Sequence, residues 1–282
     1  MSIKAISFDL DDTLWPLLPV ILKAEKDTNK WLIENYPGVE SLLKSDEVKE
    51  IRDSLISQES SLVYQLSKLR ELTLVELAIR SGYTKEESEI MARESFNIFY
   101  AGRNDVTLYE GVEEVLESLK QRYVLGVITN GNADMKIIGI DHYFDFNISA
   151  NNINAGKPDP VIFEEALKQT GLRAEEICHV GDHPVNDVEG SNNFGMKSIW
   201  FNEKGIDWPL DEKPDFKEVS SWTELEGTLE SFSLVHLACT ARRHLTLLEN
   251  NPYTYPWAAS PPNHWLLFPL IYLNLHLPFH PN

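Results

Sequence analysis

Three carboxylates stand close together near the start of the chain, at Asp9, Asp11 and Asp12. They follow a short apolar run, residues 3–8, whose β-branched residues and polar flanks are typical of a buried strand. Side chains two apart on a strand point to the same side, so we expect Asp9 and Asp11 to point together and Asp12 to point away. Adjacent carboxylates repel each other and predict a bound cation or a shared proton; a solvated acidic turn is the competing interpretation.

More polar side chains are expected at the carboxyl ends of later strands, where parallel sheets place their ligand crevice. Thr129 and Asn130 follow one strand, and Asp182 and Asp187 follow another. Lys157 is the positively charged residue of a Gly-Lys-Pro loop that precedes a helix. Each of these residues alone could be an ordinary turn or helix-cap residue, but together they form a set that suits one kind of reaction.

That reaction is phosphoryl transfer, which depends on positioning and charge neutralisation. One carboxylate can attack phosphorus and form an aspartyl-phosphate, and a second can donate and then recover a proton. A hydroxyl and a lysine can hold phosphate oxygens. Two or three aligned carboxylates would hold a hard, oxygen-seeking divalent cation, and Mg²⁺ is the one expected.

The elements that would position these residues alternate between helix and strand from Gly111 onward, which is typical of a parallel sheet covered by helices. Asp159 and Pro160 predict the start of a helix that runs to about Thr170. The fold class is therefore α/β. The expected strands are residues 3–8, 124–128, 146–149, 177–180 and 197–201.

A long helical stretch separates the first strand from this alternation. Apolar residues recur at three- and four-residue steps from Leu17 and again from Leu62. Thr84 and Glu87 form a capping box that predicts the start of another helix. The predicted organisation is a core, residues 1–15 and 104–230, with an inserted all-helical module, residues 16–103.

The charge of the chain restricts its partners. With 25 Lys and Arg against 44 Asp and Glu, the formal net charge of -19 repels nucleic-acid backbones and anionic membrane surfaces. The same field repels phosphorylated metabolites, so a phosphate site would need local positive charge from a metal, a lysine or backbone amides. We therefore expect no nucleic-acid partner.

The two cysteines, Cys178 and Cys239, show neither a metal-binding spacing nor a disulfide framework. Cys178 lies in an apolar run and is expected to be a buried core thiol. The first residues lead directly into the predicted strand, without the basic and apolar regions of a secretory signal. A cytoplasmic location is the default expectation.

The last segment, residues 231–282, differs abruptly in composition: Glu249 is its one acidic residue, and Pro, His and aromatic residues are dense. Its apolar stretch, residues 265–273, is too short and too interrupted by Pro for stable membrane insertion. Three interpretations compete: a native extension docked on an apolar surface, a weakly membrane-associated tail, or a non-native extension such as an out-of-frame read-through. We favour the last, because no helix or strand period continues into the segment.

Four short motifs, in order and spacing, resemble those of the haloacid dehalogenase-like hydrolase superfamily. The resemblance spans roughly residues 3–230 and implies a Rossmann-like core. The helical insert resembles the family's alpha-helical cap of the first type, in the branch of small-molecule phosphatases that act on flavin mononucleotide, nucleotides and sugar phosphates. The motifs are Asp9-Leu10-Asp11-Asp12-Thr13, Thr129-Asn130-Gly131, Gly156-Lys157-Pro158-Asp159-Pro160 and Gly181-Asp182-His183-Pro184-Val185-Asn186-Asp187.

The resemblance implies a role for each motif residue. Asp9 would be the nucleophile, and Asp11 would protonate the leaving alcohol and then activate water. The dehalogenases of this superfamily lack an Asp at that second position, so Asp11 favours a phosphatase that acts on a small phosphorylated metabolite. Thr129 and Lys157 would bind phosphoryl oxygens, with backbone amides near Leu10 and Asn130. Mg²⁺ would be held by Asp9, the backbone carbonyl of Asp11, and Asp182, while Asp187 would orient Lys157 or a metal-bound water.

Two other functions compete with the phosphatase. A phosphomutase of the same superfamily would need a longer-lived aspartyl-phosphate, and a catalytically silent binding protein would use the cap as a docking surface. Asp11 argues against the silent protein, because a binding role does not require it. Trp15 and Arg70 could contact substrate, but a packing Trp and a solvated helix Arg are the expected interpretations, and His179 and His183 are expected to play no part in catalysis or metal binding.

Overall fold

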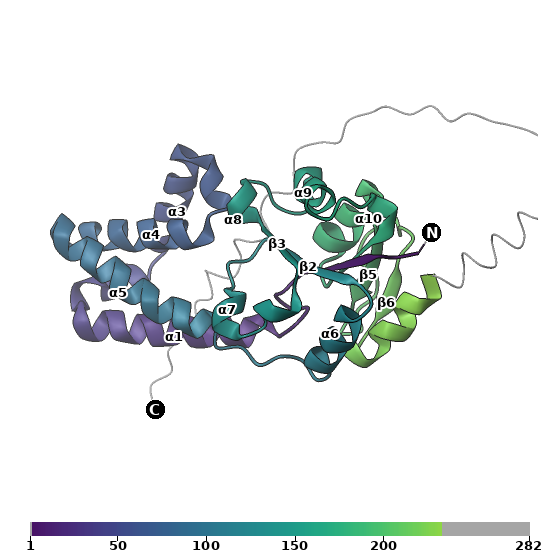
Figure 1. Ribbon diagram of the computed structural model, residues 1–282. Coiled ribbons are helices and arrows are strands. Elements are labelled where there is room, and N and C mark those ends of the chain that lie inside the picture. Colours follow the sequence, from purple (N-terminus) through teal and green to yellow (C-terminus); the bar gives the residue numbers. More distant parts are fainter. Residues whose placement is uncertain (1, 233–282) are drawn as a thin grey trace, which may run out of the picture.

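The computed structural model describes residues 2–232, shown in Figure 1. The predictions made for the tail beyond Phe232, including Cys239 and the apolar stretch, lie outside the described residues. Within residues 2–232, no helix combines the length and the apolar character that a membrane span requires.

A parallel sheet of six strands forms the centre of the core, in the order β3-β2-β1-β4-β5-β6. The strand order reverses at β1, which pairs with β2 on one side and β4 on the other, and this switch point is where open α/β sheets bind ligands. The Rossmann-like α/β prediction is confirmed. The strands are β1 Ala5–Phe8, β2 Val124–Thr129, β3 Phe146–Ser149, β4 Ile177–Gly181, β5 Lys197–Phe201 and β6 Lys217–Val219.

Strand β6 was not predicted, because its three residues, Lys-Glu-Val, are too few and too polar to show the apolar pattern of a strand. The expected helix near Val188 begins earlier, as a π-helical turn over Pro184–Glu189 that leads into α10, Gly190–Phe194. Asp159 caps α9, Pro160–Thr170, as predicted: its side chain accepts a hydrogen bond from the Val161 backbone.

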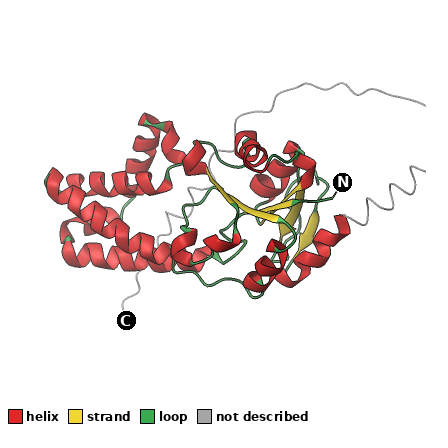
Figure 2. Ribbon diagram, in the orientation of Figure 1, coloured by secondary structure: helices red, strands yellow, loops and turns green. Residues whose placement is uncertain are grey.

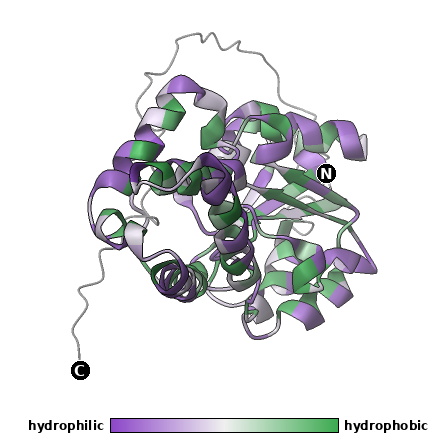
Figure 3. Cartoon of the chain, turned by 90° about the vertical axis from the view of Figure 1, so that its left-hand side faces the viewer, coloured by the Kyte–Doolittle hydropathy of each residue, from purple (hydrophilic) through white to green (hydrophobic). Residues whose placement is uncertain are grey.

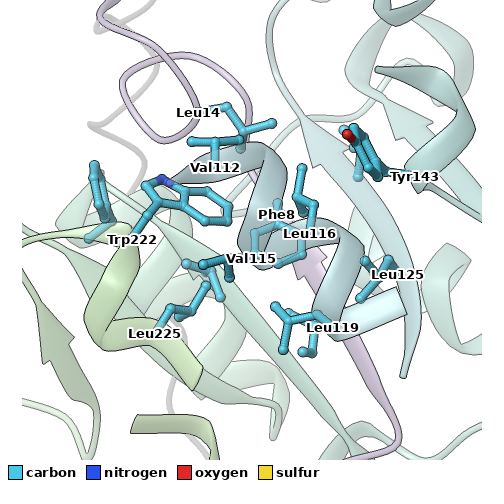
Figure 4. Packing of buried hydrophobic residues seen from close by; sticks show 14 of the residues in the cluster. Phe8, Leu14, Val112, Val115, Leu116, Leu119, Leu125, Tyr143, Trp222 and Leu225 are labelled. Carbon is cyan, nitrogen blue, oxygen red and sulfur yellow. The ribbon is translucent and has the colours of Figure 1, made fainter. Parts of the chain in front are cut away.

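Helices cover both faces of the sheet (Figures 1 and 2). On one face, Phe8 of β1 packs with α6, Val112–Lys120, whose buried residues recur at three- and four-residue steps (Figure 4). Trp222 stacks on Phe8 with ring centroids 5.5 Å apart. On the other face, Ala5 of β1 packs in a second cluster with Ile162 of α9. Both faces of β1 are therefore buried, which explains its continuous apolar sequence.

Five helices lie between β1 and α6 and group together at the left of Figure 1. They have an apolar core of their own, with Leu32, Ile51, Leu77 and Met91 among its buried members. Figure 3 looks onto this group and shows polar and apolar residues alternating along its helices. The helices are α1 Leu17–Asn35, α2 Glu40–Leu43, α3 Glu47–Gln58, α4 Leu66–Arg80 and α5 Lys85–Arg103. We refer to them as the cap helices.

The predicted capping box at the start of α5 is present. The Thr84 hydroxyl accepts from the Glu87 backbone at 3.3 Å, and the Glu87 carboxylate accepts from the Thr84 backbone at 2.8 Å. Shorter elements are α7 Met135–Ile138, α8 Ala150–Ile153, and 3-10 turns at Pro37–Val39, Ser60–Val63, Asp141–Tyr143, Ala174–Glu176 and Trp222–Glu224. The described residues end in a helical stretch over 225–232.

Candidate active site

A cavity of about 370 Å³ lies at the carboxyl ends of β1, β2 and β4 and extends to the cap helices. All seven residues singled out from the sequence as catalytic, phosphate-binding, metal-binding or supporting line this cavity. They come from four separate segments, which the parallel sheet brings together. They are Asp9, Asp11, Thr129, Asn130, Lys157, Asp182 and Asp187.

Asp9 is the first residue after β1, and its backbone N–H donates to the Val180 carbonyl at 2.9 Å. This hydrogen bond continues the pairing of β1 with β4 and fixes the direction in which Asp9 leaves the sheet. Burial raises the pKa of the Asp9 carboxyl to about 7, although nearby Lys157 opposes the shift. A cation bound at this carboxyl would favour its charged form.

Lys157 forms an ion pair with Asp9. Its Nζ lies 2.8 Å from Asp9 Oδ1 and 2.7 Å from Asp187 Oδ1, and its side chain is 1% exposed. Burial alone would lower the pKa of Lys157, but the two carboxylates outweigh burial and raise it. The lysine therefore stays protonated, and the Gly-Lys-Pro loop delivers a fixed positive charge to the end of β1.

Three carboxylates are close enough together to hold one metal ion. Asp9, Asp182 and Asp187 each offer an oxygen, and these oxygens lie within 4.8 Å of one another. Burial and the neighbouring Asp187 raise the pKa of Asp182 well above its usual value, so the cluster without a cation is electrostatically unfavourable. Carboxylate oxygens are the ligands that Mg²⁺ prefers, so this donor set fits the metal expected from the sequence.

Asp187 is the most firmly held of the three carboxylates. It accepts from the His183 backbone at 2.8 Å and lies 3.2 Å from His179 Nε2. Despite its burial, Lys157 and His179 lower the pKa of Asp187. A Cβ on Gly181 would lie 2.3 Å from the Asp187 side chain, so only glycine leaves room for it there.

His179 was expected to be an ordinary strand residue. It does lie in β4, but its imidazole bridges Ser7 Oγ at 2.9 Å and Asp187. Burial lowers the pKa of His179, which keeps the ring neutral near pH 7. His183 also fits the expected neutral loop histidine, because its Nδ1 accepts from the backbones of Val185 and Asn186.

Thr129 is the last residue of β2, and Asn130 follows it. The Thr129 hydroxyl accepts from the Gly131 backbone at 3.0 Å, so its O–H proton is available to the cavity. The Asn130 side chain donates to the Lys157 carbonyl at 2.9 Å and accepts from the Lys157 backbone at 2.8 Å. Its amide group therefore positions the lysine loop, a role that the sequence did not reveal.

Asp11 is held by a residue that the sequence analysis did not single out. Arg103, the last residue of α5, donates from Nη2 to both Asp11 oxygens, at 2.8 and 2.7 Å, and is 2% exposed. Trp15 Nε1 donates to the same carboxylate at 3.1 Å, so this buried Trp packs in the core, as expected, and also orients Asp11. A Cβ on Gly131 would lie 2.5 Å from Asp11 Oδ2, so glycine is required beside the carboxylate.

The expectation that Asp12 faces away from the site was wrong, because the chain turns after Leu10 and is no longer extended at Asp12. Asp12 has a left-handed backbone, with φ of 54°, and it lines the cavity. Its Oδ1 also accepts from the Leu17 backbone at 3.0 Å, at the first residue of α1. The strand period does not apply beyond the end of the strand.

Arg70 was expected to be a solvated helix residue, and that expectation was also wrong. Its side chain is 10% exposed, lines the cavity and pairs with Glu25 of α1. The guanidinium carbon lies 3.4 Å from the centre of the Phe99 ring. The spacing of apolar residues in the sequence does not predict that Arg70 lines the cavity, because its place there depends on how α1, α4 and α5 pack together.

A family model described as haloacid dehalogenase-like hydrolase matches residues 3–195. The chain belongs to this family. The matched range contains all four motifs that line the cavity, which confirms the resemblance seen in the sequence.

Several members of the family are similar to this haloacid dehalogenase-like hydrolase. The 5-amino-6-(5-phospho-D-ribitylamino)uracil phosphatase YigB of Escherichia coli is 27% identical over 205 residues, covering 73% of this chain and 86% of that protein. A glyceraldehyde 3-phosphate phosphatase of Methanopyrus kandleri is 29% identical, covering 70% and 83% of the two chains. A crystal structure titled 2-haloacid dehalogenase, from Pseudomonas syringae, has a TM-score of 0.77 at 38% identity and covers 82% of this chain and 99% of that one.

Proposed function

We propose that this protein is a Mg²⁺-dependent hydrolase of small phosphomonoesters that works through an aspartyl-phosphate on Asp9. One observation carries the proposal: a buried lysine and two further aspartates converge on Asp9, in a cavity that also holds the separately positioned carboxylate of Asp11. A nucleophile, a charge clamp and an acid/base group are the parts that phosphoryl transfer requires.

The reaction has two steps. In the first, an Asp9 oxygen attacks phosphorus, the bond from phosphorus to the alcohol oxygen breaks, and Asp11 gives that oxygen a proton. In the second, Asp11 takes a proton from water, whose oxygen attacks phosphorus and breaks the bond to Asp9. Inorganic phosphate leaves, and both carboxyl groups return to their starting states.

The other residues of the cavity would bind the phosphoryl group. Lys157 would neutralise its oxygens, and the Thr129 hydroxyl would donate to one of them. Asp9 and Asp182, with the backbone carbonyl of Asp11, would hold Mg²⁺, which supplies further positive charge, while Asp187 orients Lys157. The cap helices close one side of the cavity and would limit the access of water.

The relatives support a phosphatase and also name an alternative. The Escherichia coli and Methanopyrus kandleri proteins are named as phosphatases, whereas the Pseudomonas syringae structure is titled as a 2-haloacid dehalogenase. Dehalogenation would not need an acid/base carboxylate at Asp11. The Arg103 and Trp15 contacts that orient this carboxylate favour the phosphatase. A cytoplasmic location stays a prediction from the sequence.

The first test measures hydrolysis of an aryl phosphate and release of halide from 2-chloropropionate by the same preparation. We expect phosphate release that a chelator abolishes and Mg²⁺ restores, and no chloride release. Asp11→Asn should lower kcat by about 10²–10⁴-fold, because general acid–base catalysis is lost. Asp9→Asn should lower it at least as far, because the nucleophile is lost. Chloride release without phosphate release would contradict the proposed phosphatase function and support a dehalogenase instead.

A further inference from the structure

The cap helices contribute residues to the cavity in a regular pattern. Three cap helices each present two residues, one turn apart, to the cavity: Leu17 and Ile21 from α1, Leu66 and Arg70 from α4, and Phe99 and Arg103 from α5. Residues four apart lie on the same face of a helix, so these pairs form a continuous wall. The wall is apolar except for its two arginines.

Neither arginine carries an uncompensated charge. Arg70 donates to both oxygens of Glu25, with Nη1 at 3.4 Å from Oε2, and Phe99 covers one face of its guanidinium. Arg103 is paired with Asp11 through two hydrogen bonds. A guanidinium whose charge is already matched by a carboxylate attracts a further anion weakly.

The same holds on the core side of the cavity. Lys157 lies between Asp9 and Asp187, and its charge is committed to the phosphoryl position. His183 accepts backbone N–H groups at Nδ1, so that nitrogen carries no proton. Among the described residues that line the cavity, every lysine and arginine therefore has a carboxylate partner.

We infer that this cavity selects phosphomonoesters whose alcohol is uncharged and partly apolar, and that it discriminates against alcohols that carry a carboxylate. The inference rests on the proposed phosphatase function. An added carboxylate would meet the apolar cap wall, where both arginines are already paired with carboxylates, and a charge that loses its hydration without gaining a partner is strongly unfavourable.

The test compares two aryl phosphates of nearly the same shape, 4-carbamoylphenyl phosphate and 4-carboxyphenyl phosphate, with phenyl phosphate as the reference. The full-length protein with Mg²⁺ should hydrolyse the neutral amide with a kcat/KM about tenfold or more above that of the carboxylate. Equal or better hydrolysis of the carboxylate would overturn the inference while phenyl phosphate turnover still upholds the phosphatase. Absence of turnover on all three would overturn both.

Two variants link the selectivity to the ion pair. Glu25→Gln removes the partner of Arg70 and should reduce the preference for the amide about threefold or more, because an unpaired guanidinium can then receive the substrate carboxylate. The control is Glu34→Gln. Glu34 lies on the same helix, is exposed and pairs with Lys30, so its substitution makes the same change in net charge away from the cavity. It should leave the ratio unchanged. An equal ratio in the wild-type protein and Glu25→Gln would contradict the assigned role of the pair.

Discussion

At the scale of single residues, the site depends on the sharing of few positive charges among several carboxylates. Lys157 contacts both Asp9 and Asp187, and together with His179 it lowers the pKa of Asp187. Asp11 has a separate partner, Arg103. The proposed nucleophile, Asp9, and the proposed acid/base group, Asp11, therefore occupy different electrostatic surroundings, which would allow two carboxylates two residues apart to perform different tasks.

Arg103 is expected to act by positioning Asp11. Arg103→Met should lower kcat about 10- to 100-fold and change KM little, because the carboxylate loses its orientation while the phosphate-binding residues remain. The kcat of Arg103→Lys should lie between that of the wild-type protein and that of Arg103→Met, since lysine keeps the charge but cannot form the same two hydrogen bonds. Steady-state kinetics on an aryl phosphate measure both effects.

The control for this experiment is Arg93→Met, an exposed arginine of the same helix. It should keep the wild-type kcat. If Arg103→Met also turned over at the wild-type rate, the contact between Arg103 and Asp11 would have no role in catalysis.

At the scale of elements, a polar cluster fastens the amino ends of β1 and β4, far from the cavity. Lys4 donates from its backbone to the Glu176 carbonyl at 2.8 Å, and its Nζ lies 2.7 Å from the Glu176 carboxylate. Arg173 adds two further hydrogen bonds to that carboxylate. The hydrogen bond from Lys4, followed by those from Arg173, lowers the pKa of Glu176 from 4.5 to about 2.

This shift makes part of the stability depend on pH. Because the pKa is lower in the folded state than in the unfolded chain, the contribution of Glu176 is fully present above pH 4.5 and is lost as the pH falls towards 2. Glu176→Gln should therefore be less stable than the wild-type protein at pH 7, and the difference should shrink in acid. Urea unfolding across this range measures it, with the exposed Glu86→Gln as the control. A difference that grew in acid would contradict the sign of the shift.

The capping box of α5 gives a second prediction at this scale. Thr84→Ala should lower the free energy of unfolding by about 1 kcal/mol, because it removes the side chain that caps the first turn. Denaturant unfolding measures the change. Thr107→Ala, an exposed threonine outside the helices, should have little effect; equal losses in the two variants would show that the cap contributes nothing specific.

At the scale of the whole molecule, local sequence patterns were sufficient to predict the residues that meet at the strand ends. Asp9 and Asp182 each follow a strand, and Thr129 ends one; the apolar run of each strand is visible in the sequence, and parallel pairing then places the strand ends together. The sequence could not supply Arg103 or Arg70. Their carboxylate partners lie 92 and 45 residues away, and only the packing of the cap helices on one another and on the core brings them together.

The most direct test of the central claim is to look for the phosphoryl group on Asp9. Asp11→Asn should still allow attack on an activated aryl phosphate but should slow the hydrolysis that follows, so that the covalent intermediate accumulates. Rapid acid quenching, proteolysis and mass spectrometry should then find a phosphoryl group on the peptide that carries Asp9, and none in Asp9→Asn. Release of the aryl alcohol with the phosphoryl group on another residue, or on none, would contradict the account.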